Sequence, residues 1–261
     1  MICKVYRLGE IPYQAAWDLQ NQLAGEVAAG TSPPALLLLQ HPHTYTFGSR
    51  GQAENLLWDE AELERRGINV HWVDRGGDVT YHGPGQLVGY PIIPLGTANL
   101  EINADGKARL PQPDYVGYLR KLEAVIIRAL FRLGIAAGQV PGQTGVWLSP
   151  DVVSRCKTCP IHLKQQPAKI ASIGVKVDAR GITRHGFALN VAPDMRYWEG
   201  IIACGLENAN PISLEYFLDP LPEMDTLMDI VTDQFGAVFD FALQKVETAP
   251  SLYPPKFQIK A

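Results

Sequence analysis

Cys204 is the residue whose chemistry would be most useful to an enzyme. It lies in the apolar segment Ile201–Gly205, where a lone cysteine is usually a small buried hydrophobic residue. The glycine that follows it indicates a bend at which the sulfur could be presented. A nucleophilic cysteine must be a thiolate, so it needs a nearby cation or base that lowers the thiol pKa.

Lys169 is the candidate partner for that cysteine. It begins an apolar strand after a polar loop, although a lysine at a strand end usually faces solvent. An ammonium group facing Cys204 could act both as orienting charge and as base. The two residues are 35 positions apart (204 − 169), so only the fold can bring them together.

Metal ligation is a second chemistry that the residue types allow. Cys156 and Cys159 have the spacing of a zinc-binding pair, and His162 follows at the same interval. No fourth ligand is evident nearby, so the alternative is a surface loop with two free thiols. A redox CxxC pair is less favoured because no helix N-terminus is expected to activate it. His41 and His43 could also form a metal pair, but the polar rim of a pocket is the better interpretation.

The segment Arg75–Gln86 (RGGDVTYHGPGQ) is the most unusual in the chain. It contains four glycines around the short β-prone stretch Val79–Tyr81. One interpretation is a hairpin with glycine turns at both ends. The other is a cradle in which small residues and backbone N–H groups wrap an elongated substrate.

Composition excludes several classes of protein. The 261 residues are 46% hydrophobic and 19% charged, as in globular proteins with a substantial core. A net charge of −4 without a basic stripe gives no support for nucleic-acid binding. The longest apolar run, Ala35–Leu39, is too short to span a membrane. Four cysteines are too few for a disulfide scaffold, and the N-terminus reads as a strand and not as a signal peptide. We therefore expect a soluble, cytoplasmic protein.

The elements that must position these residues alternate between strands and helices. Periodicity predicts strands at 2–8, 35–39, 70–73, 86–94, 144–148, 169–177 and 182–191. It predicts helices at 12–28, 59–66 and 114–133, and mostly helical structure at 214–217 and 223–244. Helix 114–133 should bury one face, formed by Val116, Leu119, Leu122, Val125, Ile126, Ala129 and Leu130. Residues 97–113 and 149–167 read as loops and the last dozen residues as a tail. Neither a phosphate-binding GxxxxGKS/T motif nor a serine-hydrolase GxSxG motif is present.

Several of these segments together resemble one family, the octanoyltransferases of lipoate biosynthesis. Arg75–Gln86 is similar to the family signature, as are Lys169–Gly174 (KIASIG) and Arg184–Asn190 (RHGFALN). Cys204-Gly205 is similar to the family's Pro-Cys-Gly, and Gln40–Pro42 stands where the family usually has Glu-His-Pro. The resemblance runs from about residue 5 to about residue 218.

The resemblance implies a fold and a reaction. The expected fold is α/β (α+β), a single domain like the catalytic domains of biotin and lipoate ligases, with a mixed β-sheet flanked by helices. This domain would cover residues 1–245, with an inserted CxxC loop in 145–167 and a tail at 246–261. The implied reaction transfers an octanoyl group from octanoyl-acyl carrier protein to a lysine of a lipoyl domain, and needs no cofactor. The acceptors would be lipoyl domains of 2-oxoacid dehydrogenase subunits or the glycine cleavage carrier protein.

The resemblance also assigns residues. Cys204 would carry the acyl group as a thioester and Lys169 would assist. The implied lining of the acyl pocket is Arg75, Gly76, Gly77, Asp78, Val79, Thr80, Tyr81, His82, Ser172, Ile173, Gly174, Gly186, Phe187 and Ala188. Two departures from the family pattern are Ala203, which replaces proline, and the insertion that carries Cys156, Cys159 and His162.

Two alternatives stay open. An ATP-dependent lipoate or biotin ligase of the same fold would not require Cys204. A non-catalytic module that binds acyl carrier or lipoyl domains would bind them equally well after Cys204 is replaced.

Overall fold

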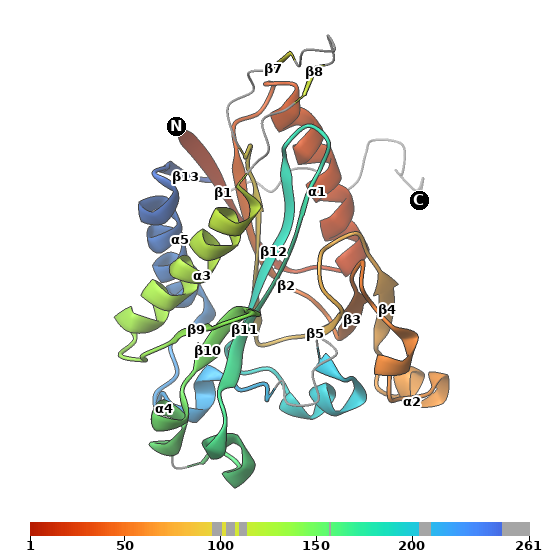
Figure 1. Ribbon diagram of the computed structural model, residues 1–261, viewed down its shortest axis with the longest axis vertical. Coiled ribbons are helices and arrows are strands. Elements are labelled where there is room, and N and C mark those ends of the chain that lie inside the picture. The colour runs from red at the N-terminus through yellow and green to blue at the C-terminus, as the bar shows by residue number, and fades with distance from the viewer. Residues whose placement is uncertain (96–100, 103–107, 110–113, 157, 204–209, 247–261) are drawn as a thin grey trace, which may run out of the picture.

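An eight-stranded mixed sheet forms the centre of the computed structural model, which describes residues 1–95, 101–102, 108–109, 114–156, 158–203 and 210–246 (Figure 1). The strands lie in the order β13 (Ala242–Val246), β1 (Ile2–Glu10), β2 (Ala35–Gln40), β6 (Gln86–Ile92), β12 (Thr183–Asn190), β11 (Ala168–Val177), β10 (Gln143–Leu148) and β9 (Gly138–Val140). The β13–β1 and β1–β2 pairs are parallel, and the other pairs are antiparallel. The expected mixed sheet is confirmed.

Helices cover both faces of this sheet. In Figure 1, α3 (Tyr115–Arg132) and α5 (Met224–Phe239) lie on one side and α1 (Tyr13–Ala28) lies on the other. The position of β2 in the sheet explains why its residues 35–39 are all apolar. Leu36 and Leu38 pack into the core beneath α3 and α5, whereas Leu37 and Leu39 pack beneath α1. Successive strand residues point to opposite faces, so a strand covered on both sides is apolar at every position.

A second sheet carries the glycine-rich segment. Its strands lie in the order β4 (Asn69–Trp72), β3 (Thr44–Phe47) and β5 (Val79–His82). Helix α2 (Glu60–Arg65) lies between β3 and β4 in the chain, and the Asp59 side chain caps it by accepting the Glu62 N–H at 2.9 Å. Aromatic and aliphatic residues of β3 and β5 form a separate core with Trp198 and Ile201.

Short elements complete the described chain. They are the 3₁₀ helices η1 (Ala53–Asn55), η2 (Ile161–Gln165), η3 (Met195–Gly200) and η5 (Leu214–Tyr216), the helix α4 (Pro150–Ser154), and the strands β7 (Glu101–Ile102) and β8 (Ala108–Arg109). The pair β7 and β8 lies within residues 97–113, which the sequence predicts as loop. Among the described residues, no helix combines the length and the apolar character needed to cross a membrane.

Two predictions about the helices are wrong. Val116 is 68% exposed and does not belong to the buried face of α3, because it lies in the first turn, beyond the stripe that faces the sheet. The predicted helix 223–244 ends at Phe239, where Asp240 takes a left-handed conformation (φ 57°), and the chain then forms β13. The segment Ala242–Val246 is too short for its periodicity to distinguish helix from strand, and it pairs with β1 as a strand. The predicted tail 246–261 lies outside the described residues from residue 247 onward.

Candidate active site

The loop Arg75–Asp78 lies along the part of β11 after Ala171, which β10 leaves unpaired. The Gly76 N–H donates to the Val175 carbonyl at 2.9 Å. A Cβ at Gly174 would lie 2.9 Å from the Gly76 carbonyl oxygen, closer than real side chains approach, so only glycine allows this contact. Arg75 is buried, and its guanidinium donates to the Thr46 hydroxyl at 2.9 Å and to the Gly76 carbonyl at 3.0 Å. The cradle predicted from the sequence is therefore a loop clamped between β3 and β11.

This loop closes one side of a narrow inner pocket on the α1 side of the main sheet. The pocket is lined by Tyr13, Arg75, Gly76, Gly77, Asp78, Thr80, His82, Tyr90, Ser172, Ile173, Gly174, His185, Gly186, Phe187 and Ala188. Small residues of β11 and β12 form its wall, because Ser172 pairs with Ala188 and Gly174 with Gly186 across the sheet. The structure brings together the predicted pocket residues from three distant segments of the chain.

Val79 and Tyr81 are the exceptions. Both are fully buried in the separate core of the small sheet, on the opposite face of β5 from Thr80 and His82. The alternation of side chains along a strand makes this unavoidable, so assigning the whole segment to the pocket was wrong at these two positions. The Tyr81 hydroxyl instead hydrogen-bonds to His43 at 2.9 Å.

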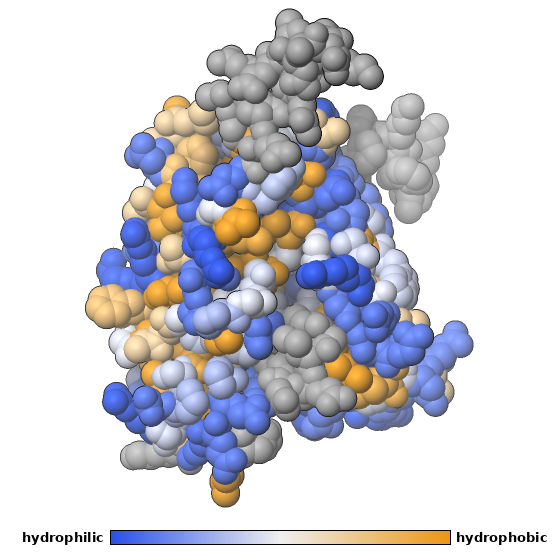
Figure 2. All heavy atoms as spheres, in the orientation of Figure 1, coloured by the Kyte–Doolittle hydropathy of each residue, from blue (hydrophilic) through white to orange (hydrophobic). Residues whose placement is uncertain are grey.

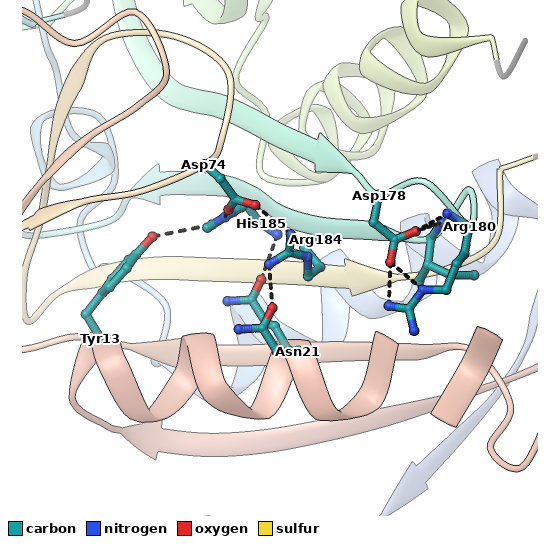
Figure 3. Close-up of polar contacts among 9 residues, drawn as sticks. Tyr13, Asn21, Asp74, Asp178, Arg180, Arg184 and His185 are labelled. Carbon is teal, nitrogen blue, oxygen red and sulfur yellow. Dashed lines mark hydrogen bonds and ion pairs between the residues drawn. The ribbon is translucent and has the colours of Figure 1, made fainter. Parts of the chain in front are cut away.

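Sequence reasoning missed three residues of the pocket, namely Tyr13, Tyr90 and His185. His185 Nε2 lies 2.9 Å from an Asp74 oxygen, and its Nδ1 lies 3.3 Å from the Tyr13 hydroxyl (Figure 3). Since a carboxylate only accepts, Nε2 carries the proton and Nδ1 accepts from Tyr13. His185 adjoins Gly186 and Asp74 adjoins Arg75, so their positions beside two family motifs were the available signal.

Electrostatics keep this chain of contacts in one protonation state. Burial lowers the pKa of His185, although Asp74 opposes the shift. The hydrogen bond from His185, together with the Arg184 guanidinium at 2.6 Å, holds the pKa of Asp74 well below its usual range. At neutral pH the array is therefore a carboxylate, a neutral imidazole and a neutral phenol. His185 also has a φ of 56°, a left-handed conformation that its surroundings must maintain.

Lys169 lies outside the inner pocket, on the wall of an adjoining cleft. The cleft has a volume of about 610 Å³ and shares Gly76, Gly77, Asp78, Ile173 and Gly174 with the inner pocket. Apolar surface gathers near the middle of the face over α3 and β11, bordered by strongly hydrophilic groups (Figure 2). Lys169 itself is 5% exposed, so it is a buried cation and not the solvent-facing lysine usual at a strand end.

Cys204 lies outside the described residues, but the chain on either side of it is placed. Before it, the Ile202 N–H donates to the Asn55 carbonyl at 2.9 Å beside the core of the small sheet. After it, the Lys169 N–H donates to the Asn210 carbonyl at 2.9 Å, and the Ile212 N–H donates to the Lys169 carbonyl at 3.0 Å. The described chain therefore stops at Ala203, beside the small sheet, and resumes at Asn210, beside Lys169.

His41 and His43 have separate surroundings. His41 is fully buried between the Ile11 carbonyl and the Tyr90 hydroxyl, each at 2.8 Å, whereas His43 stacks on Tyr197. Within the described ranges, no three His, Cys, Asp or Glu side chains are grouped so as to hold a metal. Neither histidine is among the residues that line the inner pocket, so the prediction of a polar pocket rim at His41 and His43 is wrong.

Cys156 and Cys159 form a disulfide. Both are buried, and neither sulfur is then a thiolate that can ligate zinc. The zinc hypothesis with His162 and the alternative of two free thiols are therefore both wrong. The two Cα atoms lie 5.6 Å apart, within the range of a disulfide. The His162 side chain lies outside the described residues.

The chain is similar to known proteins over most of its length. Residues 12–236 match the model of the lipoyl protein ligase A/B catalytic domain. Octanoyltransferases from Chloroflexus aurantiacus and Solibacter usitatus are 39% and 40% identical to it. These matches cover 90% and 92% of this chain and 93% and 94% of the relatives.

Solved structures share the fold at lower identity. A bipartite lipoate protein ligase from Thermoplasma acidophilum superposes with a TM-score of 0.64 at 16% identity, over 94% of this chain and 88% of that one. A lipoate-protein ligase A bound with ATP gives a TM-score of 0.61 at 17% identity, over 94% and 90%. The site geometry can therefore be interpreted within this fold.

Proposed function

The chain belongs to the lipoyl protein ligase A/B catalytic family, and we propose that it transfers an octanoyl group from octanoyl-acyl carrier protein to a lysine amine of a lipoyl domain. It is an acyltransferase, as its octanoyltransferase relatives are. The thioester intermediate on Cys204 and the carrier-protein donor are the finer parts of the proposal. We assign the activity to residues 1–245 and to the cytoplasm.

The observation that carries the proposal is the connection between the Lys169 cleft and the inner pocket. Lys169 and Ser172 lie three residues apart on β11, about 10 Å at the rise of an extended strand. An extended octanoyl chain has seven C–C bonds and spans about 8 Å, at roughly 3.6 Å for every three bonds. A carbonyl beside Lys169 would therefore place the far end of the chain among the small residues of β11 and β12.

The reaction would proceed in two steps. The Cys204 thiolate attacks the carbonyl of the donor thioester, forms a new C–S bond and expels the carrier thiolate, which takes up a proton. The lysine amine of the lipoyl domain then attacks the enzyme thioester, and Cys204 leaves as thiolate. In the first step the Lys169 ammonium stabilises the thiolate and gives its proton to the departing carrier thiolate. In the second step the neutral Lys169 amine receives the proton of the attacking lysine amine. Because a thioester is already activated, no ATP is needed.

The acceptor follows from the reaction and the family. A lipoyl domain of a 2-oxoacid dehydrogenase subunit, or the glycine cleavage carrier protein, presents such a lysine. Fold relatives include a ligase solved with its E2 lipoyl domain, which supports an acceptor of this kind.

Intact-protein mass spectrometry tests the proposal. Incubation with octanoyl-acyl carrier protein should add one octanoyl mass to the wild type and none to Cys204→Ser. Lys169→Ala should form the adduct slowly and shift its pH dependence upward. Absence of an adduct on folded wild type, or formation of octanoyl-adenylate from free octanoate and ATP, would refute the mechanism.

A further inference from the structure

The Lys169 side chain packs against an aromatic ring. Its Nζ lies 4.6 Å from the centroid of the Trp147 ring, within the range of a cation–π interaction. The two residues are direct cross-strand partners on β10 and β11. Trp147 is 3% exposed, so this contact is shielded from water, where such interactions are strongest.

Gly145 provides the space beside the lysine stem. A Cβ at this position would lie 3.4 Å from Lys169 Cε and 2.7 Å from the Ala171 carbonyl oxygen. Gly145 also has a φ of 125°, which other residues rarely adopt. The pairing of β10 with β11 also changes register next to this glycine, between Val146 and Trp147.

Glu123 holds the backbone of Gly145 through a hydrogen bond. It is 1% exposed on α3, and one carboxylate oxygen accepts the Gly145 N–H at 3.1 Å. The other oxygen accepts from Arg120 and from Gln139, both at 2.7 Å. A buried carboxylate is tolerated when it is paired and hydrogen-bonded in this way. Glu123 of α3 therefore links β9 and β10 through hydrogen bonds, next to the Lys169 side chain.

We propose that Trp147, Gly145 and Glu123 are positioning residues that hold the Lys169 ammonium at one point in the outer cleft. The indole face attracts the ammonium form and not the neutral amine, Gly145 leaves room for the stem, and Glu123 fixes the backbone of Gly145. This inference rests on the proposed function, in which Lys169 stabilises the Cys204 thiolate. None of the three positioning residues needs to touch the substrate.

The experiment compares Trp147→Phe and Trp147→Leu with the wild type. The readout is the rate of Cys204 alkylation by iodoacetamide as a function of pH, together with kcat and KM for octanoyl-acyl carrier protein. Trp147→Leu should move the alkylation profile to higher pH and lower kcat on the order of tenfold, the effect of losing a desolvated cation–π contact. The KM should change little. Trp147→Phe keeps a ring and should lie between the two.

A Lys169→Ala background separates positioning from general damage. If Trp147 acts through the lysine, Trp147→Leu should have no further effect on the pH profile of Lys169→Ala. Glu123→Gln, which keeps an oxygen for the Gly145 N–H, should retain more activity than Glu123→Ala.

Two results would overturn the inference. One is an unchanged pH profile of Cys204 alkylation in folded Trp147→Leu. The other is an equal shift of that profile by Trp147→Leu in the wild-type and Lys169→Ala backgrounds. Both differ from failure of the proposed function, in which the wild type itself forms no octanoyl adduct on Cys204.

Discussion

His41 should make the protein sensitive to mild acid. Its Nδ1 lies 2.8 Å from the Ile11 carbonyl, which can only accept, so Nδ1 carries the ring proton. Its Nε2, 2.8 Å from the Tyr90 hydroxyl, then accepts a hydrogen bond. Protonation would place a hydrogen on Nε2 where the tyrosine already donates. It would also create a charge in a fully buried site.

The size of the effect follows from the pKa. Burial lowers the pKa of His41 to about 4, from an ordinary value near 6.5. Above pH 6.5 the ring is neutral in both folded and unfolded chains, and the contribution to stability is complete. Below pH 6.5 His41 takes up a proton in the unfolded chain, whereas in the folded chain it stays neutral until the pH approaches 4. The His41 contribution to the free energy of unfolding therefore falls by about 1.4 kcal/mol per pH unit, and by about 3 kcal/mol in all by pH 4.

Urea denaturation at several pH values measures this slope. Wild type and His41→Gln are compared between pH 7 and pH 5. Glutamine removes the titrating group, so the stability difference between the two proteins should shrink by about 2 kcal/mol between pH 6.5 and pH 5. His71→Gln is the matched control, because His71 is only half-buried and should change the slope less. A stability difference that stays constant with pH would falsify the assignment of a neutral, buried His41.

Two further predictions concern packing and the disulfide. Gly186→Ala should destabilise the protein by about 1–3 kcal/mol in thermal unfolding and impair octanoyl binding, because its Cβ would lie 2.1 Å from the Gly89 carbonyl oxygen. Unchanged stability would mean that β6 and β12 can separate at this point. The double variant Cys156→Ser, Cys159→Ser should lose at most about 2 kcal/mol in urea unfolding, because the bond closes a very short loop. Reductant opens the same bond, so it should lower the stability of the wild type by no more than this amount, and loss of folding in either case would contradict the expectation.

Local sequence patterns predicted most of the scaffold. The helix begun by Asp114 and the strand carrying Lys169 both follow from residue types and spacing within one element. The same period-two rule applied to β5 would have separated Thr80 and His82 from Val79 and Tyr81.

What sequence reasoning missed depends on contacts between distant segments. Tyr13 meets His185 across 172 positions, and β13 is a strand only because β1 offers a free edge. The cation–π contact of Lys169 likewise requires the register between β10 and β11, which no single segment encodes.

The pairing of β13 with β1 also constrains how the protein is made. Ile2 pairs with Ala242, so the outer edge of β1 stays uncovered until β13 has also been synthesised. During synthesis that edge presents unpaired backbone groups, the feature that promotes association between chains. Closing the sheet joins residues 240 positions apart (242 − 2), a long-range step of the kind that slows folding. Sheet completion is therefore expected only after β13 has left the ribosome, and the edge of β1 depends on protection until then.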